Sequence, residues 1–278
     1  MATNLFAEKR FNFCTFQQLM KTLLIFLLAL PLLTFSQESL GTILIKTSPL
    51  EVDQLVSIDS YGAIYYTKNS TLYKKTSEQE LNYSNFQLNS ISYVNTFNPL
   101  KLAVFYKQFN TVVILDNRLS EIFRVDFNAL QPYRNVSFIT SGYDNSLWIF
   151  NSDVNQLELF DFKTAKSRFS TIPVTSQVLN LVSNYNFCWL LTEKFLYKYN
   201  YFGSLVSKMP NNGFTQLRQF GENIILQKEN SLFLQKENEN QTIEIQLPDL
   251  LIKQFFVTNE TLYLYDLQKV YEFKLTIN

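Results

Sequence analysis

The chain has 278 residues with 24 basic and 24 acidic side chains, a length that suits one large all-β domain or two ordinary domains. It contains no histidine, which excludes Ser-His-Asp and Cys-His catalysis and every metal site built on imidazole. Two distant cysteines and six glycines leave no CxxC redox pair and no glycine-rich phosphate loop, so we expect no catalytic residue, no metal and no cofactor.

The first 36 residues differ from the rest of the chain. Lys21 is followed by an apolar run from Leu23 to Leu33 and then by small and polar residues. A positive segment, a short apolar run and a small-residue exit are typical of a secretory signal peptide. The run is about half of the roughly 20 residues that a membrane-spanning helix needs. We therefore predict a signal peptide over residues 1–36, with cleavage near Ser36–Gln37 and with Met20 as an alternative true start.

The chain from residue 37 onward keeps 21 basic and 23 acidic side chains, a net charge of −2, so no basic field attracts nucleic acid. Cys14 precedes the apolar run and no cysteine directly follows it, so we expect no lipid anchor. Cys188, in NFCWLL, is expected to be a small buried hydrophobe. Residue usage is typical of an AT-rich bacterial genome. With the signal peptide, it predicts a Gram-negative protein of the periplasm or cell exterior, without a transmembrane helix in the mature chain.

The first strand pattern after the leader is GTILIKTS, residues 41–48, which has no obvious neighbour to pair with. Four short strand patterns follow: QLVSID, AIYYT, a strand that begins at Leu72, and ELNYS. The polar Lys-Asn-Ser between the second and third patterns predicts a hairpin turn. A lone hairpin is only marginally stable in water. The rest of the chain must therefore supply its packing partner.

The same pattern of strands recurs along the chain. A strand begins just after a polar turn at Leu72 and at five later positions, which are spaced by 36 to 45 residues. These positions are Val112, Leu157, Leu196, Leu232 and Val270. An apolar-aromatic strand precedes each of them, an earlier strand lies upstream of it, and a more polar strand follows the first five. Four short antiparallel strands in about 40 residues form the blade of a β-propeller. We predict one all-β domain, a six-bladed β-propeller over residues 37–278.

The sixth copy ends at Asn278 without a fourth strand. We expect Thr42–Thr47 to supply that strand, so that the N-terminal strand of the mature chain closes the last blade. Closure of this kind removes an exposed sheet edge that would invite aggregation. A β-sandwich is the rival architecture, but it does not explain six evenly spaced copies.

One stretch of the first copy, SIDSYGAIY, approaches the Asp box of sialidase propellers at Ser57, Asp59 and Gly62, although the glycine comes one residue late. The structural interpretation is that Asp59 and Gly62 shape the turn between two strands. The stretch also resembles the Asp-x-x-Gly-x-aliphatic-aromatic element of sensor-type and lectin-like bacterial propellers, at Asp59, Gly62, Ile64 and Tyr65. YDNSLWIF is a looser copy, with Asn145 and Ser146 before Leu147 and Trp148. Overall the chain resembles an uncharacterised family of exported bacterial propellers.

The second copy holds the strongest local pattern for a binding surface. We expect its turns to expose five residues, namely Tyr106, Lys107, Phe109, Asn117 and Arg118. Tyrosine and arginine are enriched among the anchors of protein interfaces. Phe109 serves equally well to cover the neighbouring blade. The binding residues therefore stay unknown at this stage.

The leading functional hypothesis is a non-enzymatic scaffold that holds a protein partner in the cell envelope. One version is an accessory subunit of an outer-membrane assembly or secretion machine, which is an analogy from fold alone. The alternative is a carbohydrate-binding propeller or a carboxylate-only glycosidase with a glycan as its ligand. Such a glycosidase needs two carboxylates roughly 5–9.5 Å apart, so it predicts that Asp59, Asp144 or another acid lines the channel.

Overall fold

The computed structural model describes residues 39–237 and 239–276. The predicted signal peptide, its cleavage site and the alternative start at Met20 lie outside these residues. Within them the regular structure consists of 24 strands and two 3-10 turns, η2 (Lys107–Phe109) and η3 (Phe127–Ala129). No helix in this part of the chain has the length and apolar character needed to cross a membrane. The described chain is therefore all-β, as predicted.

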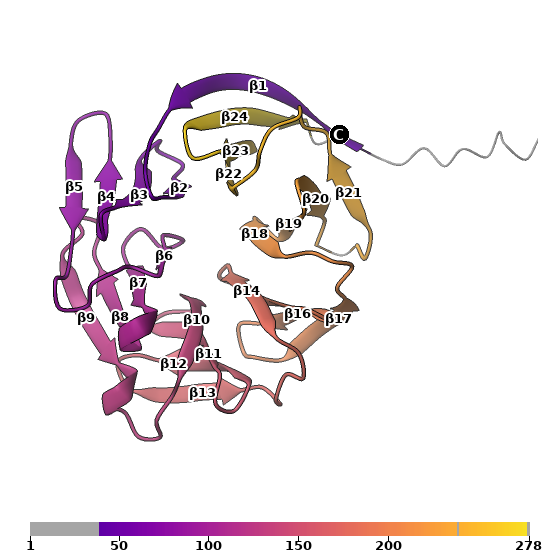
Figure 1. Ribbon diagram of the computed structural model, residues 1–278. Helices are drawn as coiled ribbons and strands as arrows, with labels where there is room; N and C mark the ends of the chain where they lie inside the picture. Colours follow the sequence, from indigo (N-terminus) through magenta and orange to yellow (C-terminus); the bar gives the residue numbers. More distant parts are fainter. Residues whose placement is uncertain (1–38, 238, 277–278) are drawn as a thin grey trace, which may run out of the picture. The chain divides into compact units, whose positions relative to one another are not determined.

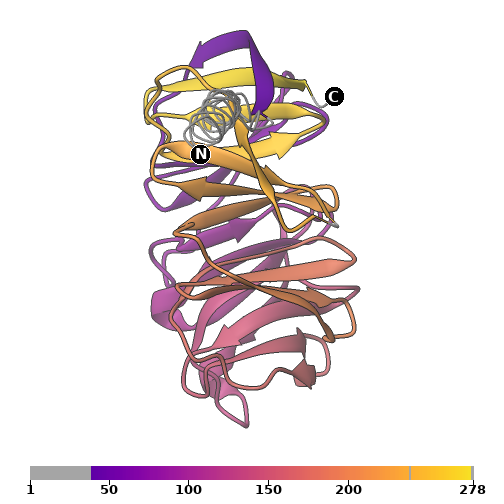
Figure 2. The same ribbon diagram turned by 90° about the vertical axis from the view of Figure 1, so that its right-hand side faces the viewer.

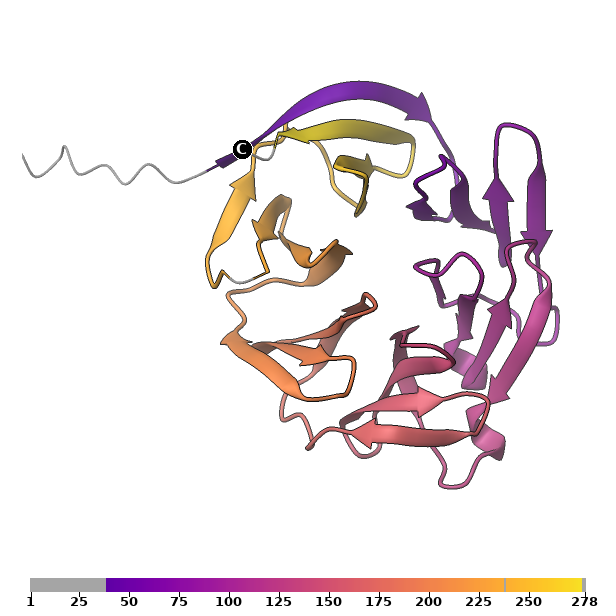
Figure 3. The same cartoon turned by 180° about the vertical axis from the view of Figure 1, so that it is seen from behind.

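Sixteen strands form four separate four-stranded antiparallel sheets, each built from strands in chain order. The first is β2 (Gln54–Ile58), β3 (Ile64–Lys68), β4 (Thr71–Lys75), β5 (Glu80–Tyr83); the second is β6 (Tyr93–Asn95), β7 (Leu102–Tyr106), β8 (Thr111–Leu115), β9 (Glu121–Asp126). The third is β10 (Val136–Ser141), β11 (Ser146–Asn151), β12 (Gln156–Asp161), β13 (Lys166–Ser170); the fourth is β14 (Val178–Ser183), β15 (Phe187–Thr192), β16 (Phe195–Asn200), β17 (Leu205–Pro210). The sheets are arranged radially, with the first strand of each nearest the centre (Figures 1 and 3). This is the arrangement of a β-propeller.

The remaining strands form one eight-stranded sheet in the order β18-β19-β20-β21-β1-β24-β23-β22. Their bounds are β18 (Gln216–Phe220), β19 (Asn223–Lys228), β20 (Ser231–Gln235), β21 (Thr242–Ile245), β22 (Gln254–Thr258), β23 (Thr261–Tyr265), β24 (Lys269–Thr276) and β1 (Ser39–Pro49). β1 pairs antiparallel with β24 from Gly41 to Pro49, which confirms the predicted pairing of the N-terminal strand with the last copy. In Figures 1 and 2 it runs along the outside of β24.

The prediction of six separate four-stranded sheets is not confirmed by this topology. The described residues form four such sheets and one sheet of eight strands. The reason is the length of β1, which has 11 residues. Its first two residues, Ser39 and Leu40, pair in parallel with β21 of the fifth copy before the strand turns to β24 of the sixth. One strand thereby joins two copies through backbone hydrogen bonds.

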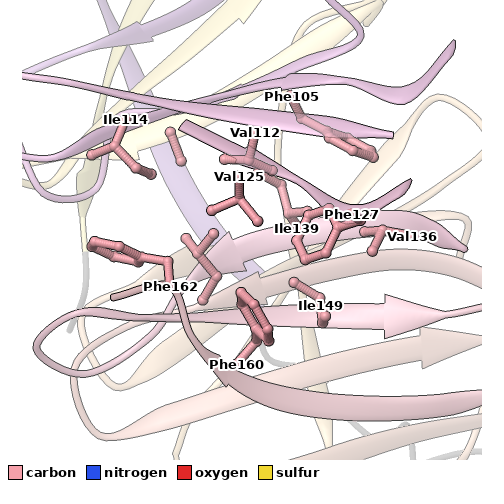
Figure 4. Packing of buried hydrophobic residues seen from close by; sticks show 12 residues of the cluster. Phe105, Val112, Ile114, Val125, Phe127, Val136, Ile139, Ile149, Phe160 and Phe162 are labelled. Carbon is pink, nitrogen blue, oxygen red and sulfur yellow. The ribbon is translucent and has the colours of Figure 1, made fainter. Parts of the chain in front are cut away.

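Buried apolar side chains fill the spaces between neighbouring sheets. Between the second and third copies, Phe105 and Val112 face Ile139 and Phe160 (Figure 4). The middle strands β7 and β8 are buried at every position because they lie between two sheets, which is why their sequences, LAVFY and TVVIL, are apolar except for Thr111. The outer strand β13 alternates between exposed and partly buried residues. Each fully buried aliphatic or Phe side chain contributes about 1.5–3 kcal/mol.

The first and last copies also pack against each other. Leu55 and Ile58 share a buried cluster with Phe256 and Val270. Across the same junction the Leu55 amide donates a hydrogen bond to Gln254 Oε1 at 2.9 Å, and the Ile58 carbonyl accepts one from a threonine hydroxyl of β22 at 2.7 Å. The ring of sheets is thus closed by side-chain packing as well as by β1.

Candidate functional site

Asp59 and Gly62 shape the turn between β2 and β3. Asp59 Oδ1 accepts hydrogen bonds from the backbone amides of Tyr61 and Ala63, both at 2.9 Å. Gly62 has φ +81°, a conformation that residues with a Cβ rarely adopt. Burial, followed by the charge of Asp59, raises the pKa of the neighbouring Tyr65. The turn interpretation of Asp59 and Gly62 is therefore confirmed.

The looser copy of this element also has a local structural explanation. Asp144 has φ +59°, and its Oδ2 lies 3.8 Å from Arg168 Nη2. Asn145 Oδ1 accepts a hydrogen bond from Lys101 Nζ at 2.8 Å, which links the second and third copies. None of the three hollows described below is lined by Asp59 or Asp144. The contacts found for these two acids are therefore those of turn residues.

The surface expected in the second copy is not formed as predicted. Tyr106 is buried, with 0% of its surface exposed, because it ends β7 and packs in the cluster between the first and second copies. Lys107 and Phe109 are exposed at η2, which connects β7 to β8. Asn117 and Arg118 are exposed in the turn after β8. Because β8 separates these two pairs, they lie at opposite ends of the sheet.

Turns of an antiparallel sheet alternate between its two ends. We call the end that carries the first and third turns of each copy the first-turn end, and the other the second-turn end. Aromatic side chains gather at the first-turn end of the first four copies. We call this set the aromatic surface; it consists of Tyr61, Phe97, Tyr143, Tyr185, Tyr201 and Phe202. Tyr61, Tyr143, Tyr185 and Phe202 are each more than half exposed.

The rings of the aromatic surface contact one another across copies. The ring centres of Phe97 and Tyr185, from the second and fourth copies, are 4.7 Å apart. Those of Tyr143 and Tyr201 are 5.9 Å apart, and those of Tyr201 and Phe202 are 4.0 Å apart. Such distances are typical of favourable aromatic pairs. Five of the six rings therefore form two connected groups, and Tyr61 has no such ring contact among the described residues.

Hydrogen bonds between neighbouring copies hold the turns beneath the aromatic surface in place. Three of them join two polar side chains, and the fourth joins a side chain to a backbone carbonyl, all near the ends of the inner strands. The bonds are Ser57 Oγ with Thr96 Oγ1 (2.6 Å), Asn95 Nδ2 to Thr140 Oγ1 (3.1 Å), Thr140 Oγ1 with Ser183 Oγ (2.9 Å) and Asn184 Nδ2 to the Gly221 carbonyl (2.8 Å). They link the first five copies in succession. A surface fixed in this way loses little conformational freedom when a partner binds.

The aromatic residues of the first turns follow a pattern in the sequence that a comparison of strand motifs does not show. The first turn of each of the first four copies holds an aromatic residue, namely Tyr61, Phe97, Tyr143 and Tyr185. The corresponding turns of the fifth and sixth copies hold Gly221-Glu222 and Asn259-Glu260 instead. Alignment of the copies on their turns, rather than on their strands, shows the aromatic positions.

The second-turn end carries a groove made of two adjoining hollows of 590 and 250 Å³, which share Lys107, Ser137 and Phe138. The smaller hollow reaches the inner strands β6, β10, β14 and β18. The larger hollow extends outward over the connection between the third and fourth copies. We call these two hollows together the Lys107 groove.

A third hollow, of 210 Å³, lies between the fourth and fifth copies. Its Lys198 is 9% exposed, and Nζ lies 3.7 Å from the ring centre of Phe187 and 3.6 Å from Glu237 Oε1. Gln235 is buried here because it ends β20 beneath this junction. Lys198 thus has an ion-pair partner and an aromatic neighbour, which are the contacts of a structural lysine.

Cys188 is fully buried in the cluster between the third and fourth copies, as expected for a small hydrophobe. Burial raises the pKa of its thiol well above the ordinary value. The described residues contain no group of three or more Cys, Asp or Glu side chains arranged to hold a metal ion.

No protein-family model matches the chain, and no curated protein matches it. Solved structures do. A catalytically inactive histidine-to-alanine variant of virginiamycin B lyase from Staphylococcus aureus with quinupristin is 13% identical, with 87% of this chain and 97% of that chain covered and a TM-score of 0.58. A chain of the mitotic checkpoint complex is 11% identical, with 86% of each chain covered and a TM-score of 0.59. PorZ, a surface component of the type-IX secretion system of Porphyromonas gingivalis, is 14% identical, with 80% of this chain and 31% of that chain covered and a TM-score of 0.51.

At these identities the likeness concerns the fold alone. The radial sheets, the inner position of each first strand and the packing between sheets agree with it. The chain therefore has an all-β fold of the β-propeller type.

Proposed function

We propose that this protein is a non-enzymatic β-propeller that binds a partner protein through the aromatic surface. The observation that carries the proposal is the cluster of exposed tyrosine and phenylalanine rings at the first-turn end. Soluble monomers rarely expose large contiguous apolar patches unless the patch binds something. Tyrosine is enriched in the residues that dominate binding energy at interfaces.

The architecture we propose is one domain over residues 37–278 with six blades. In this proposal the eight-stranded sheet counts as two four-stranded blades, β18 to β21 and β22 to β24 with β1. Its support is that the described residues form six buried apolar clusters, each shared by two neighbouring copies. A six-membered ring has six such junctions.

The localisation of the protein is also a proposal, and it rests on the sequence of residues 1–36. We propose export by a signal peptide to the periplasm or exterior of a Gram-negative bacterium, without a lipid anchor. One form of the scaffold hypothesis is an accessory subunit of an outer-membrane assembly or secretion machine. The fold shared with PorZ, a surface component of a secretion system, supports this form as an analogy only.

The likeness to virginiamycin B lyase does not extend to an activity here. The matched lyase variant is described as catalytically inactive after one histidine was replaced by alanine. This chain has no histidine at any position. A histidine-dependent mechanism of that kind has no equivalent group to use here.

The test is photo-crosslinking in the native envelope with a photoreactive residue in place of Tyr143, which is 53% exposed. The matched control is Tyr133, which is 47% exposed but belongs to the connection before β10 at the second-turn end. We expect one stoichiometric protein adduct from position 143 and none from position 133. We also expect Tyr143→Ala with Tyr185→Ala to abolish capture of that partner. Equal adducts from both positions, or adducts with glycan only, would refute the proposal.

A further inference from the structure

The Lys107 groove differs in charge from the rest of the protein. Of the residues that the structure describes, its lining includes two cations, Lys107 and Arg218, and no Asp or Glu. The chain from residue 37 onward has a net charge of −2, with 21 basic and 23 acidic residues, so a groove lined by one sign of charge is not a consequence of composition. Clefts of this kind concentrate ligands of the opposite charge.

Neither cation has a carboxylate partner among the residues that the structure describes. Among the described residues, no carboxylate oxygen lies within 4.0 Å of the charged nitrogens of Lys107 or Arg218. Arg218 Nη1 donates one hydrogen bond, to the Leu217 carbonyl at 3.3 Å. A guanidinium has five N–H donors, so others remain for a ligand. By contrast, Lys198, which lies between the fourth and fifth copies, forms an ion pair with Glu237.

Aromatic rings hold both cationic groups in position. Lys107 Nζ lies 5.7 Å from the ring centre of Phe138, and Arg218 Cζ lies 5.9 Å from that of Phe255. The Lys107 backbone amide donates to Ser92 Oγ at 3.1 Å, which ties η2 to the segment before β6. Cation–π contacts of this length orient a cation without removing its charge. Both groups are therefore preorganised for a ligand.

The rest of the lining is neutral. It combines the aromatic rings of Tyr93 and Phe138 with the polar side chains of Asn180, Thr175 and Gln177. Pockets of about 300–1,000 Å³ hold ligands much larger than a single small anion. The larger hollow, of 590 Å³, is in that range, and the smaller one, of 250 Å³, adjoins it. Its two ends differ, since Arg218 and Asn180 line the hollow near the inner strands, whereas Thr175 and Gln177 line the outer hollow.

We propose that the Lys107 groove binds an acidic polypeptide segment, with carboxylates that contact Arg218 and Lys107. Arg218 takes one carboxylate in a bidentate contact, which a guanidinium is shaped to make. Lys107 takes a second carboxylate, and the outer hollow accommodates the neutral part of the segment. This site lies at the opposite end of the sheets from the aromatic surface, and it is independent of the proposed function.

The experiment uses the processed full chain and an array of peptides rich in Asp and Glu. A second array carries the same peptides with each acid replaced by Asn or Gln. Peptides that bind are then measured by fluorescence anisotropy. We expect binding to the acidic array only, and Arg218→Gln and Lys107→Gln each to weaken it at least about tenfold. The matched control is Arg118→Gln, which removes an exposed charge at the first-turn end and is expected to leave affinity unchanged.

Several results would overturn the proposal. One is that neither array binds, or that both arrays bind equally. Another is that Arg118→Gln weakens binding as much as Arg218→Gln, which indicates general charge attraction. A third is that inorganic phosphate, at the concentration of the peptide, displaces it completely, which indicates a small-anion site. Because the crosslink from Tyr143 does not depend on the groove, its result is separate from these.

Discussion

The buried ion pair between Arg134 and Glu158 gives a quantitative test of what holds neighbouring copies together. Arg134 Nε donates to Glu158 Oε2 at 2.9 Å, and the two side chains are 6% and 7% exposed. The carboxylate also accepts hydrogen bonds from Asn151 Nδ2 at 3.0 Å and from the Ser167 hydroxyl. The Arg134 carbonyl accepts a hydrogen bond from Asn110 Nδ2 of the second copy at 2.6 Å. The pair therefore anchors the connection between the second and third copies.

We expect Glu158→Gln to lower the free energy of unfolding by about 3–5 kcal/mol, because the guanidinium of Arg134 is then buried without a counter-charge. For a domain of this size, that loss corresponds to a fall in Tm of roughly 6–20 °C. The matched control is Glu121→Gln. Arg124 Nη2 and Glu121 Oε2 are 2.7 Å apart, but their side chains are 37% and 32% exposed. An exposed pair contributes about 1 kcal/mol at most.

The pH dependence gives a second readout of the same pair. Burial by itself would raise the pKa of Glu158, but hydrogen bonds from Ser167, Arg134 and Asn151 outweigh it and lower the pKa below its ordinary value of 4.5. Since the folded-state pKa is lower than the unfolded one, the stabilisation is complete above the unfolded pKa. It is lost as the pH falls through the folded pKa. We expect the difference between wild type and Glu158→Gln to shrink on acidification below about pH 4.5.

Urea denaturation followed by tryptophan fluorescence measures these changes, because Trp148 and Trp189 are both buried. The reasoning is refuted if Glu158→Gln costs no more than Glu121→Gln. It is also refuted if the difference between wild type and Glu158→Gln is the same at neutral and acidic pH.

Three further predictions concern the closing strand, the thiol and a tyrosine. On strand β1, Leu40 is 6% exposed and Leu44 is 53% exposed. In urea denaturation, Leu40→Ala should therefore lower the free energy of unfolding by about 2–5 kcal/mol, and Leu44→Ala by less than about 0.5 kcal/mol. Equal losses would show that β1 does not pack as described. Cys188 should resist thiol reagents in the folded mature protein and react once on unfolding, whereas rapid labelling of the folded protein would contradict its burial. Burial, followed by a hydrogen bond to Glu80, raises the pKa of Tyr66 to about 12, so Glu80→Gln should lower it in an absorbance titration. Because the pKa of Tyr66 is higher in the folded state than in the unfolded state, its contribution to stability is complete below the unfolded-state pKa and is lost as the pH rises through the folded-state pKa. An unchanged titration of Tyr66 in Glu80→Gln would count against the contact with Glu80.

The strands were predictable because buried strand positions carry apolar residues, which are visible in the sequence. The middle strands lie between two sheets and are apolar at successive positions, and the expected starts at Leu72 and Val112 are both fully buried. The turn at Asp59 and Gly62 was predictable from local chemistry alone. The pairing of the N-terminal strand with the last copy was predictable from the number of strands, because the last copy has three strands in the sequence pattern and the N-terminal strand has no partner beside it.

The remaining features depend on tertiary geometry. The pairing of Leu40 with Ile245 makes one sheet of two copies, and no residue pattern indicates it because the two segments are more than 200 residues apart. Tyr106 was expected in an exposed turn, yet it is the last residue of the buried strand β7, and the turn begins only at Lys107. The cationic character of the groove needs Lys107 and Arg218 together, and they come from different copies of the repeat. Neither stands in a motif.

The distribution of aromatic residues among the first turns indicates how a partner approaches. These turns have the same position in every copy, yet the first four hold an aromatic residue and the last two hold Glu222 and Glu260. If the rings were needed to pack the turns, all the copies would need them, and Tyr61 and Tyr143 would not be more than half exposed. Their restriction to one arc of the ring therefore favours recognition over packing. For the proposed partner, this distribution predicts an interface that covers the first four copies and leaves the acidic fifth and sixth turns in water.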